Sequence, residues 1–258
     1  AVLRALDVSG NYFQSSMFEG AFYIDRKDTG GFQISGTLEL GSYGNRVIDN
    51  HFLNLTDSFS FGKTERKNYQ DKPQDSDQSG YVCSTLVMGN HFEIDSTIYN
   101  GDGTAKAENL IDLKNGCDTK EGENLFTINR YQGSRPTAGG GTGSTGEAIV
   151  LQRAAQHIRF EKEVIYNCAA GFTFQPTNKN YPNEPGAGNI KIEDLVIAKT
   201  PYIVKDVAGK DPVNGVAFRT HPKVKNVTIE NALILDTRLL VSGKMSETFN
   251  LKYIEWRY

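Results

Sequence analysis

The amino-acid sequence predicts an all-β fold: a right-handed parallel β-helix, or solenoid, with long polar loop insertions. Three observations favour it: a motif that recurs about every 40 residues, a row of short strands with one shared apolar alternation, and no sustained helical period. Because stacked repeats bury one continuous core, we expect residues 1–258 to form a single β-helical domain that belongs to a longer chain.

The recurring motif places an Asn two residues before a Phe. It occurs at Gly10–Phe13, Asp49–Phe52 and Gly89–Phe92, with the Asn at positions 11, 50 and 90 and hence separations of 39 and 40 residues. We expect each Asn to occupy a left-handed corner and to hydrogen-bond to the Asn of the next repeat, while the Phe stacks inside. Weaker copies of the motif follow at Glu123–Phe126, Ile165–Cys168 and Ile229–Ala232.

Other repeat folds fit the sequence less well. β-Propeller blades have a similar period but need four strands each and a Trp or Gly-His signature, and the single Trp of this chain lies near its end. Leucine-rich repeats need a ladder of Leu with a period of about 20–29 residues. A stack of two or three short strands per repeat therefore remains.

A second row of segments predicts one strand per repeat. Its members are Phe22–Arg26, Phe59–Lys63, Ile111–Asn115, Ile149–Arg153, Phe172–Pro176 and Tyr202–Asp206. The first and third residues of every member are large and apolar, so they are expected to face the core, while the second and fourth face outward. In the third member this alternation places Asp112 and Lys114 together on the solvent face.

Three polar insertions separate these strands: Lys63–Gly80, Gly133–Gly146 and Pro176–Gly188. Insertions in repeat proteins often emerge on one face and build a binding site there. They can wall a groove over Asp112 and Lys114, or they are ordinary surface loops.

Charge and cysteine content restrict the function. With 28 basic and 31 acidic residues the net charge is −3, and no basic stripe supports nucleic-acid binding. No apolar run approaches the roughly 20 residues of a membrane span. The three cysteines, Cys83, Cys117 and Cys168, lack metal-type spacing, and their odd number leaves at least one thiol outside any disulfide.

The corner motifs, the strand Glu108–Lys114 and the later segment Gly146–Arg153 resemble bacterial polysaccharide lyases of the pectate and alginate lyase type. The resemblance implies a secreted or cell-surface protein that acts on an acidic, uronate-containing polysaccharide by β-elimination. It implies Lys114 as the base, Arg153 as a partner of the base or of the substrate carboxylate, and Glu108 and Asp112 as Ca²⁺ ligands.

The chemistry agrees with that assignment, because a cation must stabilise the charge that develops when the proton next to a uronate carboxylate is removed. Further substrate contacts are expected from the outward strand row, from a loop histidine and from a late Arg and His. These candidates are Tyr23, Asp25, Gln152, Gln175, His157, Arg219 and His221.

A non-catalytic interpretation stays open, since two carboxylates supply fewer oxygen ligands than calcium usually takes. Asp112 and Lys114 can equally be a solvated ion pair worth less than about 1 kcal/mol. His51 and His91 directly follow the corner Asn residues and are expected to be surface residues without a metal. The chain would then be an adhesin or tailspike-like module that binds glycans or self-assembles through its solenoid ends.

Overall fold

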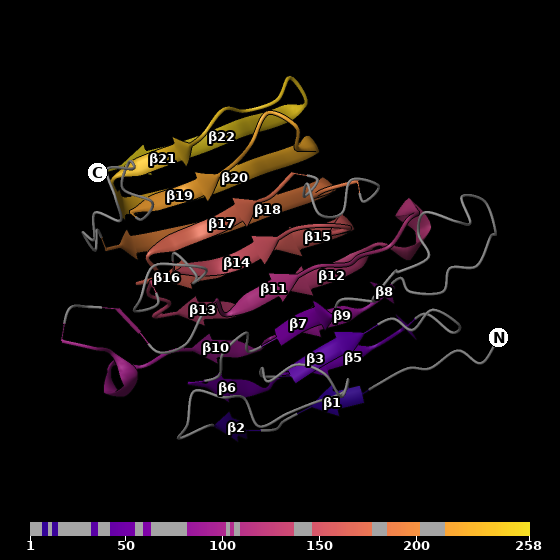
Figure 1. Cartoon of the computed structure of the whole chain (residues 1–258), viewed down its shortest axis with the longest axis horizontal. Coiled ribbons are helices and arrows are strands. Elements are labelled where there is room, and N and C mark those ends of the chain that lie inside the picture. Colours follow the sequence, from indigo (N-terminus) through magenta and orange to yellow (C-terminus); the bar gives the residue numbers. More distant parts are fainter. Residues whose placement is uncertain are drawn as a thin grey trace.

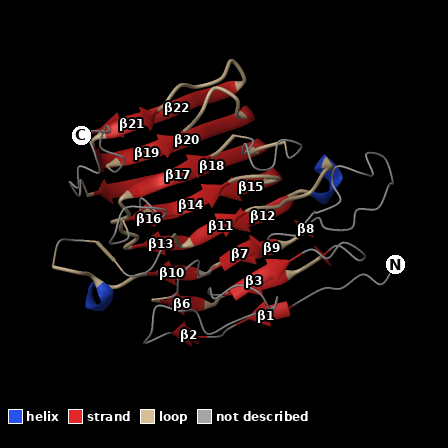
Figure 2. Cartoon of the chain, viewed as in Figure 1, coloured by secondary structure: helices blue, strands red, loops and turns tan. Residues whose placement is uncertain are grey.

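The computed structural model describes residues 7–9, 12–14, 32–35, 42–54, 59–62, 82–101, 104–105, 109–136, 146–176, 185–201 and 215–258. In these residues the fold is all-β apart from two short 3₁₀ helices, η1 at Ser96–Ile98 and η2 at Lys120–Gly122 (Figures 1 and 2). Within the same residues, no helix is long and apolar enough to cross a lipid bilayer.

The largest sheet has thirteen strands, and every pairing in it is parallel. One arm contains β1 (Asp7–Ser9), β5 (Arg46–Ile48), β9 (Leu86–Met88), β12 (Asn124–Thr127) and β15 (Gln156–Glu161). The other arm contains β2 (Tyr12–Gln14), β6 (His51–Leu53), β10 (His91–Glu93), β13 (Arg130–Gln132) and β16 (Val164–Tyr166). The long strands β18 (Gly188–Thr200), β20 (Lys225–Thr237) and β22 (Phe249–Arg257) continue both arms.

A second parallel sheet has seven strands. They are β3 (Phe32–Ser35), β7 (Phe59–Gly62), β11 (Ile111–Leu113), β14 (Glu147–Leu151), β17 (Ala170–Phe174), β19 (Val216–Arg219) and β21 (Leu239–Ser242). A small third sheet pairs β4 (Ser42–Tyr43) with β8 (Val82–Cys83). The chain visits one arm, then the other, then the second sheet before it returns, so each strand pairs with its counterpart one repeat later (Figure 1).

The inward row of the seven-stranded sheet confirms the predicted alternation in its central strands. Phe59, Ile111, Ile149 and Phe172 lie in register on β7, β11, β14 and β17, and all four are buried. The predicted ends of that row are wrong. The strand beside β7 is β3 and the strand beside β17 is β19, whereas 22–26 and 202–206 lie outside the described residues. β3 and β19 also place an apolar residue in register with Phe59 and Phe172. The alternation alone therefore does not distinguish these two strands from 22–26 and 202–206.

Asparagines form the predicted ladder at a corner between the two arms. The backbone N–H of Asn50 donates to Oδ1 of Asn90 at 2.9 Å, and the N–H of Asn90 donates to Oδ1 of Asn129 at 2.9 Å. The aromatic residues two positions later stack inside, with Phe92 centred 4.9 Å from Phe52 and 5.3 Å from Tyr131.

Two details of the predicted ladder are corrected. The member after Asn90 is Asn129, whereas Asn124 belongs to another row, where its Oδ1 accepts from the N–H of Thr85. Asn11 lies outside the described residues. In the ladder the left-handed conformation belongs to the residue before the Asn, with φ of 54° at Asp49 and 67° at Gly89. The left-handed residue turns the chain, and the Asn after it satisfies the N–H group that the turn takes out of the strand ladder. In two of the weaker copies the Asn itself is left-handed as expected, with φ of 54° at Asn167 and 56° at Asn231.

The ladder ends on a carboxyl group. Nδ2 of Asn129 donates to Oε1 of Glu163 at 3.1 Å, and Leu195 holds the corresponding position in the next repeat. Glu163 is fully buried, and its Oε2 has no hydrogen-bond partner among the described residues. Burial raises the pKa of Glu163 to about 8, against the opposing effect of its hydrogen bonds. At neutral pH the protonated carboxyl therefore takes the place of an amide.

One disulfide is formed among the cysteines. Cys83 at the end of β8 bonds to Cys117, which follows β11, over a sequence separation of 34 residues. Cys168 is a buried free thiol. The bridge holds the segment after β11 against the edge of the small sheet.

Candidate functional site

Asp112 lies on β11 in the seven-stranded sheet, and Lys114 follows directly after that strand. On the outward side of this sheet, Asp112 is in register with Val150, then Thr173, then Arg219. Asp112 is 4% exposed, Val150 3% and Thr173 4%. The expectation of a solvated strand face is therefore wrong for Asp112, Val150 and Thr173, which are enclosed.

Both carboxylate oxygens of Asp112 are engaged. Nζ of Lys114 lies 2.6 Å from Oδ2, and Nε2 of Gln152 donates to Oδ1 at 2.8 Å. A buried carboxylate is costly unless a cation and hydrogen-bond donors compensate its charge, and here one of each does so. The Lys114 side chain is 25% exposed.

A second ion pair lies further along the same sheet. Nη1 of Arg219 contacts Oε1 of Glu147 at 2.6 Å, and Oγ1 of Thr173 donates to the same oxygen at 3.4 Å. Sequence reasoning selected Arg219 and missed Glu147. An acid in the buried run Glu-Ala-Ile-Val-Leu required a cationic partner, and that requirement was the available signal.

Arg153 and Gln175 follow the ends of neighbouring strands. The N–H of Ala154, next to Arg153, donates to the carbonyl of Lys114 at 3.2 Å, so the Arg153 backbone lies beside that of the predicted base. Arg153 is buried and has a left-handed φ of 58°. Half-buried Gln175 continues the ladder one strand beyond Gln152, because its N–H donates to the carbonyl of Leu151.

The two predicted histidines lie at a different place. His157 is part of β15 in the thirteen-stranded sheet, where its Nε2 lies 3.4 Å from Nδ2 of Asn189. His221 follows β19, and its Nδ1 accepts from the N–H of Lys223 at 3.2 Å, which closes a turn. Residues next to both histidines line a cleft of about 500 Å³: Gln156, Pro185, Ala187, Gly188, Asn189, Pro222, Lys223, Lys225 and Asn226.

The remaining candidates, Tyr23, Asp25 and Glu108, lie outside the described residues. Calcium prefers about six to eight oxygen ligands. In the described part of the chain, Asp112 belongs to no group of three His, Cys or acidic residues with adjacent ligand atoms, and Lys114 already neutralises it. The described residues alone therefore do not fit a calcium ion, and that expectation depends on Glu108.

No protein-family model matches the chain, and comparisons with curated proteins and with solved structures find no match either. The lyase resemblance of the sequence stays a prediction.

Proposed function

We propose that the chain is a right-handed parallel β-helix that binds an acidic, uronate-containing polysaccharide and cleaves it by β-elimination. The observation that carries the proposal is a set of two ion pairs on the seven-stranded sheet. There Lys114 and Arg219 each pair with an enclosed carboxylate, on Asp112 and Glu147 respectively. Cations held in place before the ligand arrives suit the repeated carboxylates of a uronate chain.

The parallel ladders support the fold part of the proposal, since each strand pairs with its counterpart one repeat later. The Cys83–Cys117 bridge supports a secreted or cell-surface location, because disulfides persist mainly in oxidising compartments.

In the proposed reaction, Lys114 removes the proton on the carbon next to the uronate carboxylate. The electron pair of that C–H bond forms a carbon–carbon double bond, and the bond to the glycosidic oxygen breaks. The leaving oxygen then takes a proton from solvent. Lys114 can accept a proton only when uncharged, so it must first leave the ion pair with Asp112 and release its own proton to solvent.

The same ion pair favours a second candidate, a non-catalytic glycan-binding or assembly module. A charged ammonium group suits carboxylate binding rather than proton removal. On β22, the last strand of the chain, Tyr253 and Trp256 are 78% and 44% exposed. Such aromatic side chains can stack on sugar rings or on a neighbouring molecule.

The test incubates the purified chain with pectate, alginate and glycosaminoglycans, with and without calcium, and follows the ultraviolet absorbance of the unsaturated product. Lys114→Arg keeps the cation but not a usable base, because a guanidinium stays protonated. Loss of cleavage with retained binding in this variant supports the lyase. The control is Lys191→Arg, since Lys191 pairs with Glu193 at 2.7 Å in the other sheet.

Binding without cleavage, weakened by Lys114→Ala but not by Lys191→Ala, supports the second candidate. Cleavage that continues unchanged in Lys114→Arg removes Lys114 as the base. If the chain neither binds nor cleaves any uronate polymer, the proposal as a whole is overturned.

A further inference from the structure

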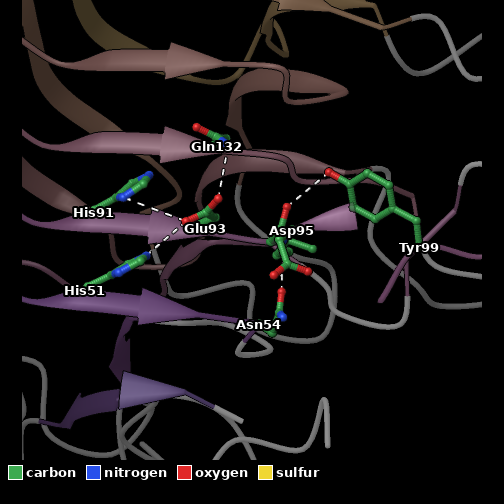
Figure 3. A network of polar contacts seen from close by, with 8 residues as sticks. His51, Asn54, His91, Glu93, Asp95, Tyr99 and Gln132 are labelled. Carbon is green, nitrogen blue, oxygen red and sulfur yellow. Dashed lines mark hydrogen bonds and ion pairs between the residues drawn. The ribbon is translucent and has the colours of Figure 1, made fainter. Parts of the chain in front are cut away.

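The asparagine ladder aligns two histidines on the outside of the thirteen-stranded sheet. His51 and His91 directly follow Asn50 and Asn90, and they lie in register on β6 and β10. Their imidazole rings stack with centroids 4.6 Å apart and planes 9° apart (Figure 3). Their side chains are 32% and 34% exposed, so solvent reaches both.

The carboxylate of Glu93, which lies on β10 with His91, points at both rings (Figure 3). Oε2 of Glu93 lies 3.0 Å from Nε2 of His51 and 3.9 Å from Nδ1 of His91. Its other oxygen, Oε1, accepts a hydrogen bond from Nε2 of Gln132 at 3.1 Å. Gln132 therefore orients the carboxylate so that one oxygen faces the imidazoles.

We propose that His51, His91 and Glu93 bind one divalent transition-metal ion of the zinc class. The ligand atoms of the three side chains all lie within 4.8 Å of one another. Imidazole nitrogens favour zinc and its neighbours over calcium or magnesium, which prefer oxygen ligands. Two His and one Glu leave a fourth position of a tetrahedral site to water or to a ligand.

Binding needs a small rearrangement. Zinc bonds to imidazole nitrogen and carboxylate oxygen are about 2.0–2.2 Å long, so two ligand atoms of one ion lie at most about 4.4 Å apart. The lone pairs of an imidazole lie in its ring plane, so the stacked rings must tilt until both aim at the ion near Oε2 of Glu93. Half-exposed side chains can make that rotation without repacking the core.

Among the described residues, the positive charge of Arg130 opposes the ion. Arg130 on β13 is the next residue in register after His91. It is exposed, so solvent and salt screen its charge. The orientation of Glu93 by Gln132 acts in the opposite direction, because groups that position metal ligands raise metal affinity by about 10–100-fold.

The test titrates ZnCl₂ into the untagged, disulfide-bonded chain after removal of metals by EDTA, using calorimetry and metal analysis. We expect one zinc ion per chain, at least tenfold weaker binding in His51→Ala, His91→Ala and Glu93→Gln, and a 10–100-fold loss in Gln132→Ala. The chain has four histidines, so His157→Ala and His221→Ala are matched controls that should bind zinc as the wild type does.

Imidazole NMR signals test the unmutated chain and avoid any folding defect in the variants. Zinc should shift the signals of His51 and His91 and leave those of His157 and His221 in place. The proposal is overturned if no zinc binds, or if the double variant His51→Ala/His91→Ala binds as tightly as the wild type. Neither result depends on whether the chain cleaves a polysaccharide.

Discussion

Two polar clusters lie on the outside of the two large sheets, and they differ in burial. In the seven-stranded sheet, Asp112 is 4% exposed and is held by Lys114 and Gln152. In the thirteen-stranded sheet, His51 and His91 are about one-third exposed. Parallel stacking aligns the side chains in both places, but only the first cluster must compensate a buried charge.

The difference in burial decides how much each cluster contributes to the free energy of folding. An enclosed charge pair costs several kcal/mol when one partner is removed, because the other charge is left without compensation. A half-exposed pair contributes about 0–1 kcal/mol, since water replaces the missing partner. The Asp112 cluster should therefore affect folding as well as ligand binding, whereas the histidine cluster should affect ligand binding alone.

The largest effect is expected from the disulfide that holds the segment after Lys114. Replacing Cys83 and Cys117 by Ser should lower the free energy of unfolding by about 3–4 kcal/mol, as expected for a closed loop of this length. Urea unfolding of the oxidised chain and the double variant measures it. Cys168→Ala, which removes a thiol but no cross-link, should cost clearly less. Equal losses in the two variants would mean that the bridge adds no stability.

Removal of Lys114 should have the next largest effect. Lys114→Ala removes the ammonium group that lies 2.6 Å from the enclosed carboxylate of Asp112, so we expect a loss on the order of 3 kcal/mol, reduced by the partial exposure of the lysine. The double variant Lys114→Ala/Asp112→Asn should recover part of that loss in urea unfolding. If the single variant loses less than about 0.5 kcal/mol, the pair behaves like a surface pair and the contrast between the clusters fails.

Glu163 tests whether burial, rather than the choice of sheet, decides such costs. It is fully buried near the corner between the arms of the thirteen-stranded sheet, and its pKa is raised from its ordinary value of 4.5 to about 8. The folded state therefore holds a proton that the unfolded state has released between these pH values. The contribution of Glu163 to stability should be largest below pH 4.5 and should decrease as the pH rises toward about 8.

Urea unfolding at several pH values checks this dependence. Glu163→Gln should remove the slope, because an amide fills the end of the ladder without a proton to lose. Glu161→Gln is the control, since Glu161 is partly exposed and pairs with Arg159. The same slope in wild type and Glu163→Gln would assign the pH dependence to other groups.

Local patterns carried the sequence predictions that the structure confirms. The alternation in β7, β11, β14 and β17 sets which side chains face the core, and it can be seen within five residues. The row ended elsewhere because insertions of unequal length separate the strands, and the sequence does not show which later segment completes a repeat. β3 and β19 therefore hold places that were predicted for 22–26 and 202–206.

The site shows the same limit. Asp112 and Lys114 are two residues apart, so their shared face was predictable. Glu147 and Arg219 are 72 residues apart, and their contact depends on the register of three strands. Asn129 escaped the corner motif because its core aromatic is Tyr131 rather than Phe. The period of the motif was the available signal, because Asn129 follows Asn90 by 39 residues.

The smallest expected effect lies at the histidine cluster. His51→Ala removes the 3.0 Å contact with Glu93 and one ring of the stack, and should change the free energy of unfolding by less than about 1 kcal/mol in EDTA. Zinc should then separate the variants: it should raise the thermal midpoint of the wild type and of His221→Ala, but not that of His51→Ala, because only an ion bound to the folded state stabilises it. A large loss of stability in EDTA would make His51 a structural residue. The histidine cluster would then contribute to folding as the Asp112 cluster does.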